Sequence, residues 1–346
     1  MVTEYLKSIL TVAEQDLYKK MYEAFSTQKS RVECKGYSQQ SIVKVYAAVY
    51  HDHPELFYLS YAPQLATTFS FMGKILTLIS ESIYSHREIS QFNTKIEEIK
   101  RYILSKAASC KNQKDKELCI IDFLIENTLY EIDHKYHQNA ASVLVNKKGQ
   151  CSGISKAVKL LCDHLGIECI VVEGTGFDES MGLSGAHAWN IVKIDGKYYH
   201  LDVTFMIGAN LSKRKPFRYL FFNASDVEFE KNHTWERKKY PKCNTSGATH
   251  VGEPCIRSTS PKDTHRIDPS KKIITSMFFF RGELSNLIRE KGRELTFISK
   301  IKSKESDDLA SLYLNEAVAV AKAKGIAVSI NVCTKGKEVT ISLSWK

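Results

Sequence analysis

Residues 185–205 predict a two-stranded hairpin whose register decides which side chains can act together. The segment GAHAWNIVKIDGKYYHLDVTF carries apolar and polar residues in alternation around Asp195-Gly196, a dipeptide that favours a two-residue turn. With such a turn, Trp189 lies opposite Asp202, and His187 lies two residues before Trp189 on the same face. His187 and Asp202 are then diagonal neighbours, about 7–8 Å apart at the backbone. A three-residue turn would change which residues share a face of the hairpin and would separate His187 from Asp202.

A helix is predicted to begin at Cys151, directly after Gly149-Gln150. Its apolar positions recur at steps of three and four and end before Gly166, a good helix terminator; they are Cys151, Ile154, Val158, Leu161 and Leu165. A helix N-terminus presents unpaired N–H groups and a partial positive charge. Both favour the thiolate form of Cys151, which is the nucleophilic form. Taken alone, a cysteine at a helix start is usually structural.

The hairpin gives Cys151 the partners that nucleophilic catalysis requires. An imidazole on one strand and a carboxylate on the next form a base and the group that orients it. His200 shares the face of Asp202, but it pairs with Ile191 and is predicted to be a packing residue. The residue types therefore predict Cys151, His187 and Asp202 as a catalytic set.

The three blocks resemble the transglutaminase-like superfamily. They are a helix start (GQCSG), a strand (GAHAWN) and a strand end (LDVTF), in this chain order. The resemblance covers about 113–242. It includes FRYLFFNASDVEF and HTWERKKYP, which are similar to the tail of bacterial members, and HDHPELFYLS is similar to their lead-in. Residues 256–346 show no resemblance to a family that we recognise.

The resemblance implies a papain-like core with Cys151 as nucleophile, His187 as base and Asp202 as its orienter. Two departures from the family pattern are Ser152, where many bacterial members have Gln, and Phe205, where Trp is usual. No Trp lies upstream of Cys151, and Val145 stands six residues before it, where papain-like enzymes have Gln. The resemblance therefore does not identify the side chain that would donate a hydrogen bond to an oxyanion. Candidates for the oxyanion or substrate site are Tyr130, Gln150 and Trp189, with Tyr136 as an alternative tyrosine. Neither a cofactor nor a metal is assigned.

The fold class predicted for the chain is α+β, with four parts. Residues 1–110 form an N-terminal α/β extension, with helices at 3–25 and 39–50 and a hairpin over 65–84. Residues 111–243 are the catalytic core, and 244–270, rich in Ser, Thr, Gly, Pro and charge, are a linker. Residues 271–346 form a small accessory module with strands at about 272–280 and 294–302, a helix at 306–324 and a last hairpin.

Composition narrows the class of protein and its partners. The net charge of +10 comes without a nucleic-acid-binding motif, so no nucleic-acid partner is expected. The charge indicates a solvated basic surface, and if it does serve binding, acidic proteins or an anionic surface are the favoured partners. No apolar run is long enough to span a membrane. The nine cysteines are an odd number without a CxxC pair, and the N-terminus does not read as a signal peptide, which together predict reduced thiols in a cytoplasmic setting. The oligomeric state stays open.

The predicted function is cysteine-dependent acyl chemistry on protein or peptide amides through a thioacyl-enzyme intermediate. The enzyme would be an acyltransferase, a deamidase or a hydrolase. Two alternatives remain at this point: a cysteine peptidase of papain-like fold, and a catalytically silent module that binds a protein partner.

Overall fold

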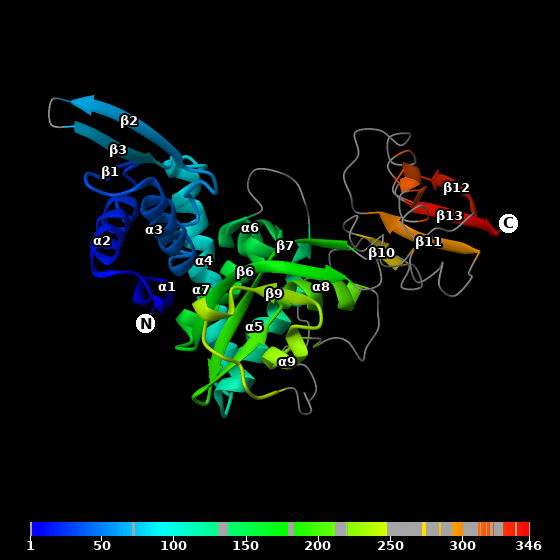
Figure 1. Cartoon of the computed structure of the whole chain (residues 1–346). Helices are drawn as coiled ribbons and strands as arrows, with labels where there is room; N and C mark the ends of the chain where they lie inside the picture. The colour runs from blue at the N-terminus through cyan, green and yellow to red at the C-terminus, as the bar shows by residue number, and fades with distance from the viewer. Residues whose placement is uncertain are drawn as a thin grey trace.

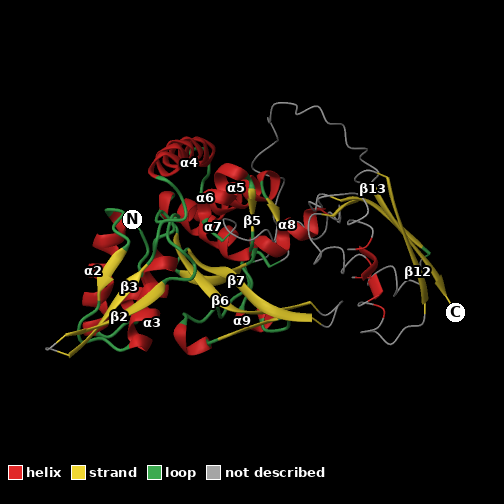
Figure 2. Ribbon diagram, turned by 90° about the horizontal axis from the view of Figure 1, so that it is seen from above, coloured by secondary structure: helices red, strands yellow, loops and turns green. Residues whose placement is uncertain are grey.

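The computed structural model of the chain is an α+β protein with a central helix-and-sheet core (Figure 1). The structure describes residues 2–70, 73–130, 138–178, 183–211, 219, 221–247, 272–274, 284, 293–299, 311, 313–315, 317–318, 321, 328–335 and 338–345. The N-terminal helices and hairpin lie on one side of the core, and the strands nearest the C-terminus lie on the other (Figures 1 and 2).

The core sheet has four antiparallel strands in the order β8-β7-β6-β9. The strands are β6 (Glu168–Asp178), β7 (Leu183–Ile194), β8 (Lys197–Leu201) and β9 (His233–Trp235). Helix α7 (Cys151–His164) packs against β6 and β7. A buried amide links the two layers, because Asn190 Nδ2 on β7 donates to the Ser155 carbonyl on α7 at 2.9 Å. The start of α7 is thereby held in register with the strand that carries His187.

Three helices and a short parallel strand pair complete the core around α7. The helices are α5 (Gln113–Asn127), α6 (Ala140–Asn146) and α8 (Val203–Leu211), and the strands are β4 (Leu129–Tyr130) and β5 (Lys148–Gly149). A single-turn helix, α9 (Asp226–Phe229), precedes β9.

The β7–β8 turn has the predicted two residues. Asp195 and Gly196 both have positive φ, 49° and 80°, as a tight hairpin turn of this length requires, and Ile194 pairs with Lys197. The predicted register is confirmed. The prediction that the second strand continues through 202–205 is wrong, because β8 ends at Leu201 and α8 begins at Val203. The reason is local: Asp202 Oδ1 accepts the Phe205 backbone N–H at 3.1 Å, the hydrogen bond of a helix N-cap.

The N-terminal region departs from the single helix predicted over 3–25. It contains α1 (Tyr5–Ser8) and α2 (Val12–Ser26), divided at Thr11, which forms a capping box with Glu14. The expected second helix is present as α3 (Gln39–Asp52), and the expected hairpin as β2 (Gln64–Ser70) and β3 (Gly73–Ile79). Strand β1 (Arg31–Glu33) pairs with β3, and α4 (His86–Ala107) leads into the core.

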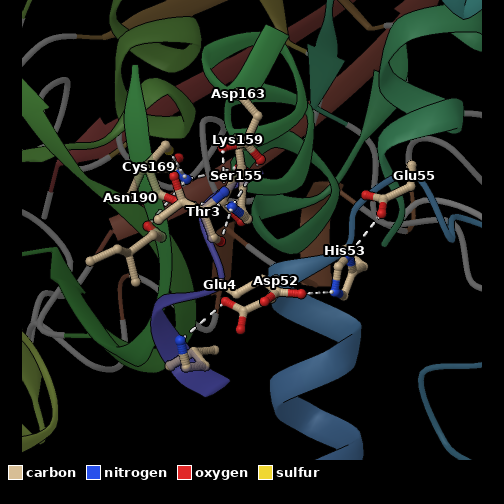
Figure 3. Close-up of polar contacts among 12 residues, drawn as sticks. Thr3, Glu4, Asp52, His53, Glu55, Ser155, Lys159, Asp163, Cys169 and Asn190 are labelled. Atoms are coloured by element: carbon tan, nitrogen blue, oxygen red, sulfur yellow. Dashed lines mark hydrogen bonds and ion pairs between the residues drawn. The ribbon is translucent and has the colours of Figure 1, made fainter. Parts of the chain in front are cut away.

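A buried polar network fastens the N-terminus to α7 (Figure 3). The fully buried Lys159 ammonium donates to Asp163 Oδ2 at 2.9 Å, to the Thr3 carbonyl at 2.8 Å and to the Cys169 carbonyl at 3.1 Å. Asp163 Oδ1 in turn accepts the Thr3 backbone N–H at 3.2 Å. One apolar cluster extends from Leu6 to Cys243, so residues on both sides of the predicted 110/111 boundary share a core.

Near the C-terminus, four described strands form a separate sheet in the order β10-β11-β13-β12. They are β10 (Lys272–Ile274), β11 (Glu294–Ser299), β12 (Val328–Lys335) and β13 (Glu338–Trp345). The alternating residues Val339, Ile341 and Leu343 are buried, as a one-faced strand requires. Residues 248–270 of the predicted linker, and most of the helix predicted at 306–324, lie outside the described residues. Among the described helices, none combines the length and the apolar character needed to cross a membrane.

We expect Lys159→Met to lower the free energy of unfolding by about 3 kcal/mol, measured by urea denaturation at pH 7. The substitution leaves the Asp163 carboxylate buried without its cation, and breaking a buried pair from one side carries a cost of that order. Lys44→Met is the control, since Lys44 is 49% exposed in its ion pair with Glu14 and should lose less than about 1 kcal/mol. Equal losses in the two variants would contradict the role given to Lys159.

Candidate active site

Cys151 is the first residue of α7, at the helix end that faces the β4–β5 pair. Gln150 is the N-cap residue and has an extended backbone, but its side chain makes no capping hydrogen bond. Gly149, at the end of β5 just before Gln150, pairs with Tyr130 of β4. The Cys151 side chain is half-buried. The sequence prediction of a cysteine at a helix start therefore holds, and the helix dipole favours a negative sulfur there.

His187 and Asp202 are joined by a short hydrogen bond. His187 Nε2 lies 2.6 Å from Asp202 Oδ2, and the Asp202 side chain is fully buried whereas that of His187 is 10% exposed. The pair meets between strand β7 and the N-terminus of α8, not across two paired strands. Because Nε2 faces the carboxylate, Nδ1 is the ring nitrogen left for Cys151.

His187 interacts with both Cys151 and Asp202, and the charges of the three side chains favour a thiolate–imidazolium pair. Burial by itself raises the pKa of Cys151, but the hydrogen bond and charge of His187, with the Ala188 backbone N–H, outweigh it and lower that pKa. Burial likewise opposes a charged His187, yet the Asp202 charge and hydrogen bond, with the Cys151 sulfur, raise the His187 pKa to about 10. Despite burial, His187 and His233 hold the pKa of Asp202 below its usual range.

The three oxyanion and substrate-site candidates have different surroundings. Tyr130 lies beside the predicted catalytic residues: burial, and then the charges of Cys151 and Asp202, raise its pKa, so its hydroxyl stays a hydrogen-bond donor. Gln150 Oε1 accepts from Gln138 Nε2 at 3.3 Å. Trp189 is fully buried, and its indole N–H donates to His200 Nδ1 at 3.0 Å. Among the three, Tyr130 has the surroundings expected of an oxyanion donor. Tyr136 lies outside the described residues.

His233 is a site residue that the sequence reasoning missed. Its Nε2 lies 3.2 Å from Asp202 Oδ2, the same oxygen that His187 contacts. The signal was present, since His233 opens the HTWERKKYP block that resembles the tail of bacterial members. Nothing in its spacing pointed to Asp202, because strand β9 reaches the site by pairing with β6.

Among the residues that the structure describes, two groups of side chains have donor atoms close enough to consider a metal ion. Within each group the donor atoms lie within 4.8 Å of one another. The first group is His187, Asp202 and His233, and the second is His200, Asp226 and Cys243. In the second group the Trp189 N–H points at His200 Nδ1, so the proton of the neutral ring is on Nε2, 2.9 Å from Asp226 Oδ1. Burial lowers the His200 pKa to about 4, which keeps the ring neutral.

A metal on His200 Nε2 would move that proton to Nδ1, where the indole N–H already points, so hydrogen bonding accounts for the second group. The donor atoms of the first group are likewise hydrogen-bonded to one another.

Part of the chain is similar to known proteins. Residues 100–203 match the description "Transglutaminase-like superfamily". The chain contains a transglutaminase-like domain. Kyphoscoliosis peptidase of Mus musculus is 27% identical over 114 residues, which are 29% of this chain and 17% of that protein. The shared part is thus a small fraction of the relative's length. A solved TGase structure is 18% identical, covers 50% of each chain and has a TM-score of 0.30.

The match fixes the general class of the transglutaminase-like domain. It contains Cys151 and His187 and ends one residue after Asp202, whereas His233 lies beyond it. The fold is α+β, as the sequence predicted.

We expect Cys151 to be the cysteine that iodoacetamide alkylates fastest at pH 6. Its pKa is lowered mainly by His187, whereas an ordinary thiol, with a pKa of about 8.5, is almost fully protonated at that pH. Peptide mapping after limiting alkylation measures the reaction. Cys333 is the control, because it is an exposed free cysteine. Labelling of Cys333 equal to that of Cys151 at pH 6 would contradict the thiolate assignment.

Proposed function

We propose that Cys151, His187 and Asp202 carry out thiol acyl chemistry on carboxamide or peptide carbonyls of protein substrates. The observation that supports it is that His187, which lowers the pKa of Cys151, also has its Nε2 2.6 Å from the buried Asp202 carboxylate. Each member has the partner that its role in nucleophilic catalysis requires.

The proposed reaction begins with the thiolate of Cys151 attacking the carbonyl carbon. A carbon–sulfur bond forms, and the carbonyl oxygen gains negative charge, for which the helix-start backbone N–H and the Tyr130 hydroxyl are suitable donors. The carbon–nitrogen bond then breaks, and protonated His187 gives its proton to the leaving amine. The product is a thioester on Cys151 and a free amine, or ammonia from a primary carboxamide.

The thioester is then resolved by an incoming nucleophile whose proton returns to His187. Water gives a carboxylic acid, which is hydrolysis or deamidation, and an amine gives a new amide, which is acyl transfer. Exclusion of water from the site decides between these outcomes. Asp202 keeps the His187 ring in one orientation and stabilises its charged form in both steps.

A peptidase is the second candidate, and the peptidase name of the curated relative favours it. The two candidates share the acyl-enzyme and differ in the bond that is broken. Incubation with a peptide library that contains glutamine distinguishes them. New N-termini indicate a peptidase, whereas release of ammonia or incorporation of a labelled primary amine indicates chemistry on a side-chain amide.

We expect His187→Ala to lower turnover by about 100-fold or more, the usual contribution of a general acid and base. Asp202→Asn should give a partial loss, because the asparagine side-chain oxygen can still accept the Phe205 N–H that Asp202 Oδ1 accepts. Both losses are measured as steady-state rates on the amide substrate identified with the peptide library, and circular dichroism shows whether each variant is folded. His86→Ala, at an exposed histidine, is the control. Full activity of folded His187→Ala would refute the proposal.

We further propose that the region 271–346 is an accessory module. The catalytic candidates all precede it, and it has its own four-stranded sheet. A chain ending at Gly247 keeps the contacts of that residue, whose N–H donates to Asn223 O at 2.8 Å. We expect this shortened chain to fold and to keep the alkylation profile of Cys151. Loss of folding or of Cys151 reactivity would show instead that the C-terminal region belongs to the catalytic unit.

A further inference from the structure

One carboxylate oxygen serves two imidazoles. Asp202 Oδ2 lies 2.6 Å from His187 Nε2 and 3.2 Å from His233 Nε2, while Asp202 Oδ1 accepts the Phe205 N–H at 3.1 Å. The carboxylate is thus held on both oxygens, by groups from β7, β9 and the first turn of α8. Of these contacts, only the one to His187 belongs to the proposed catalytic set.

His233 is built into its place by aromatic packing. Its side chain is fully buried, and its ring stacks on Phe229 with centroids 3.8 Å apart and planes at 16°. Other rings enclose it at centroid distances between 5.1 and 5.5 Å, namely Trp189, Phe205, Phe221 and His187. Such a ring has no access to bulk water, and its contact with the proposed catalytic set is the one to Asp202.

The hydrogen-bonding groups around His233 favour a neutral ring that donates to Asp202. Burial disfavours a charged imidazole here, and a neutral ring has a single N–H. Both ring nitrogens face oxygen atoms, Nε2 facing Asp202 Oδ2 and Nδ1 facing Asn232 Oδ1 at 3.0 Å. The proton makes the stronger bond on Nε2, because the carboxylate carries a full negative charge.

We propose that His233 is a positioning residue that fixes the Asp202 carboxylate throughout the reaction cycle. The proposal rests on the proposed function of the same site. When His187 gives its proton to the leaving amine, its charge-assisted bond to Asp202 weakens. The His233 N–H remains bonded to Asp202 Oδ2 through this step, so the carboxylate keeps its position and His187 returns to the same orientation before the second step.

The test compares two substitutions that separate packing from hydrogen bonding. His233→Phe keeps an aromatic ring against Phe229 and removes the N–H, whereas His233→Gln offers an amide N–H near the former Nε2 position. We expect His233→Phe to lower kcat about tenfold with little change in KM, and His233→Gln to retain most of the wild-type kcat. The maximal alkylation rate of the Cys151 thiolate should be unchanged in both, because alkylation does not use proton transfer to a leaving group.

Three outcomes would overturn the positioning role. They are a wild-type kcat in folded His233→Phe, an equal loss in both variants, and a loss confined to KM. If His233→Phe does not fold, nitrogen-15 NMR of histidines in the unaltered protein decides the question. We expect His233 to carry its proton on Nε2 and its signal to shift in Asp202→Asn. A proton on Nδ1 alone would refute the proposal.

Failure of the proposed function would be recognised separately. In that case unaltered Cys151 would show no enhanced alkylation at pH 6 and no amide would turn over. The NMR experiment would still report whether His233 donates to Asp202, because it needs no substrate.

Discussion

The buried carboxylate of Asp202 is the interaction around which the site is organised. A charge without solvent must be paired and hydrogen-bonded, or the fold would pay several kcal/mol for it. Asp202 meets this demand with the first turn of α8 and with two imidazoles. The same residue therefore ends strand β8, begins a helix and fixes His187, so the structural requirement and the proposed chemistry coincide at one side chain.

The position of Cys151 depends on how α7 is held at both ends. Near the start of the helix, the Asn190 amide bonds the Ser155 carbonyl and couples α7 to the strand of His187. Towards its end, the buried side chains of Lys159 and Asp163 form hydrogen bonds with the backbone of Thr3 in the N-terminal segment. A helix fixed in this way presents its first residue to the sheet with little freedom. Such rigidity is needed where a sulfur and a ring nitrogen must stay within hydrogen-bonding distance.

The sequence predicted the parts of the site that depend on local rules. The spacing of apolar residues located the helix that begins at Cys151, and Asp195-Gly196 gave the register of the β7–β8 hairpin. Local reasoning failed where a short-range alternative competed. Apolar spacing over 3–25 suggested one helix, but the capping box at Thr11 begins a new one. The alternation of apolar and polar residues predicted that the second strand continues through 202–205, but Asp202 caps a helix there.

By itself, then, the sequence determined the helix start, the hairpin and the three catalytic candidates, since turn chemistry and periodicity act over a few residues. Only the tertiary structure decided that His233 shares Asp202, that the Trp189 N–H is directed to His200, and that Lys159 receives the N-terminus. The Lys159 and His233 contacts join residues distant in the chain, brought together when the layers pack, and that of Trp189 depends on which ring the folded core sets against its indole. No local pattern encodes such contacts, because they depend on which faces of the helices and sheet meet.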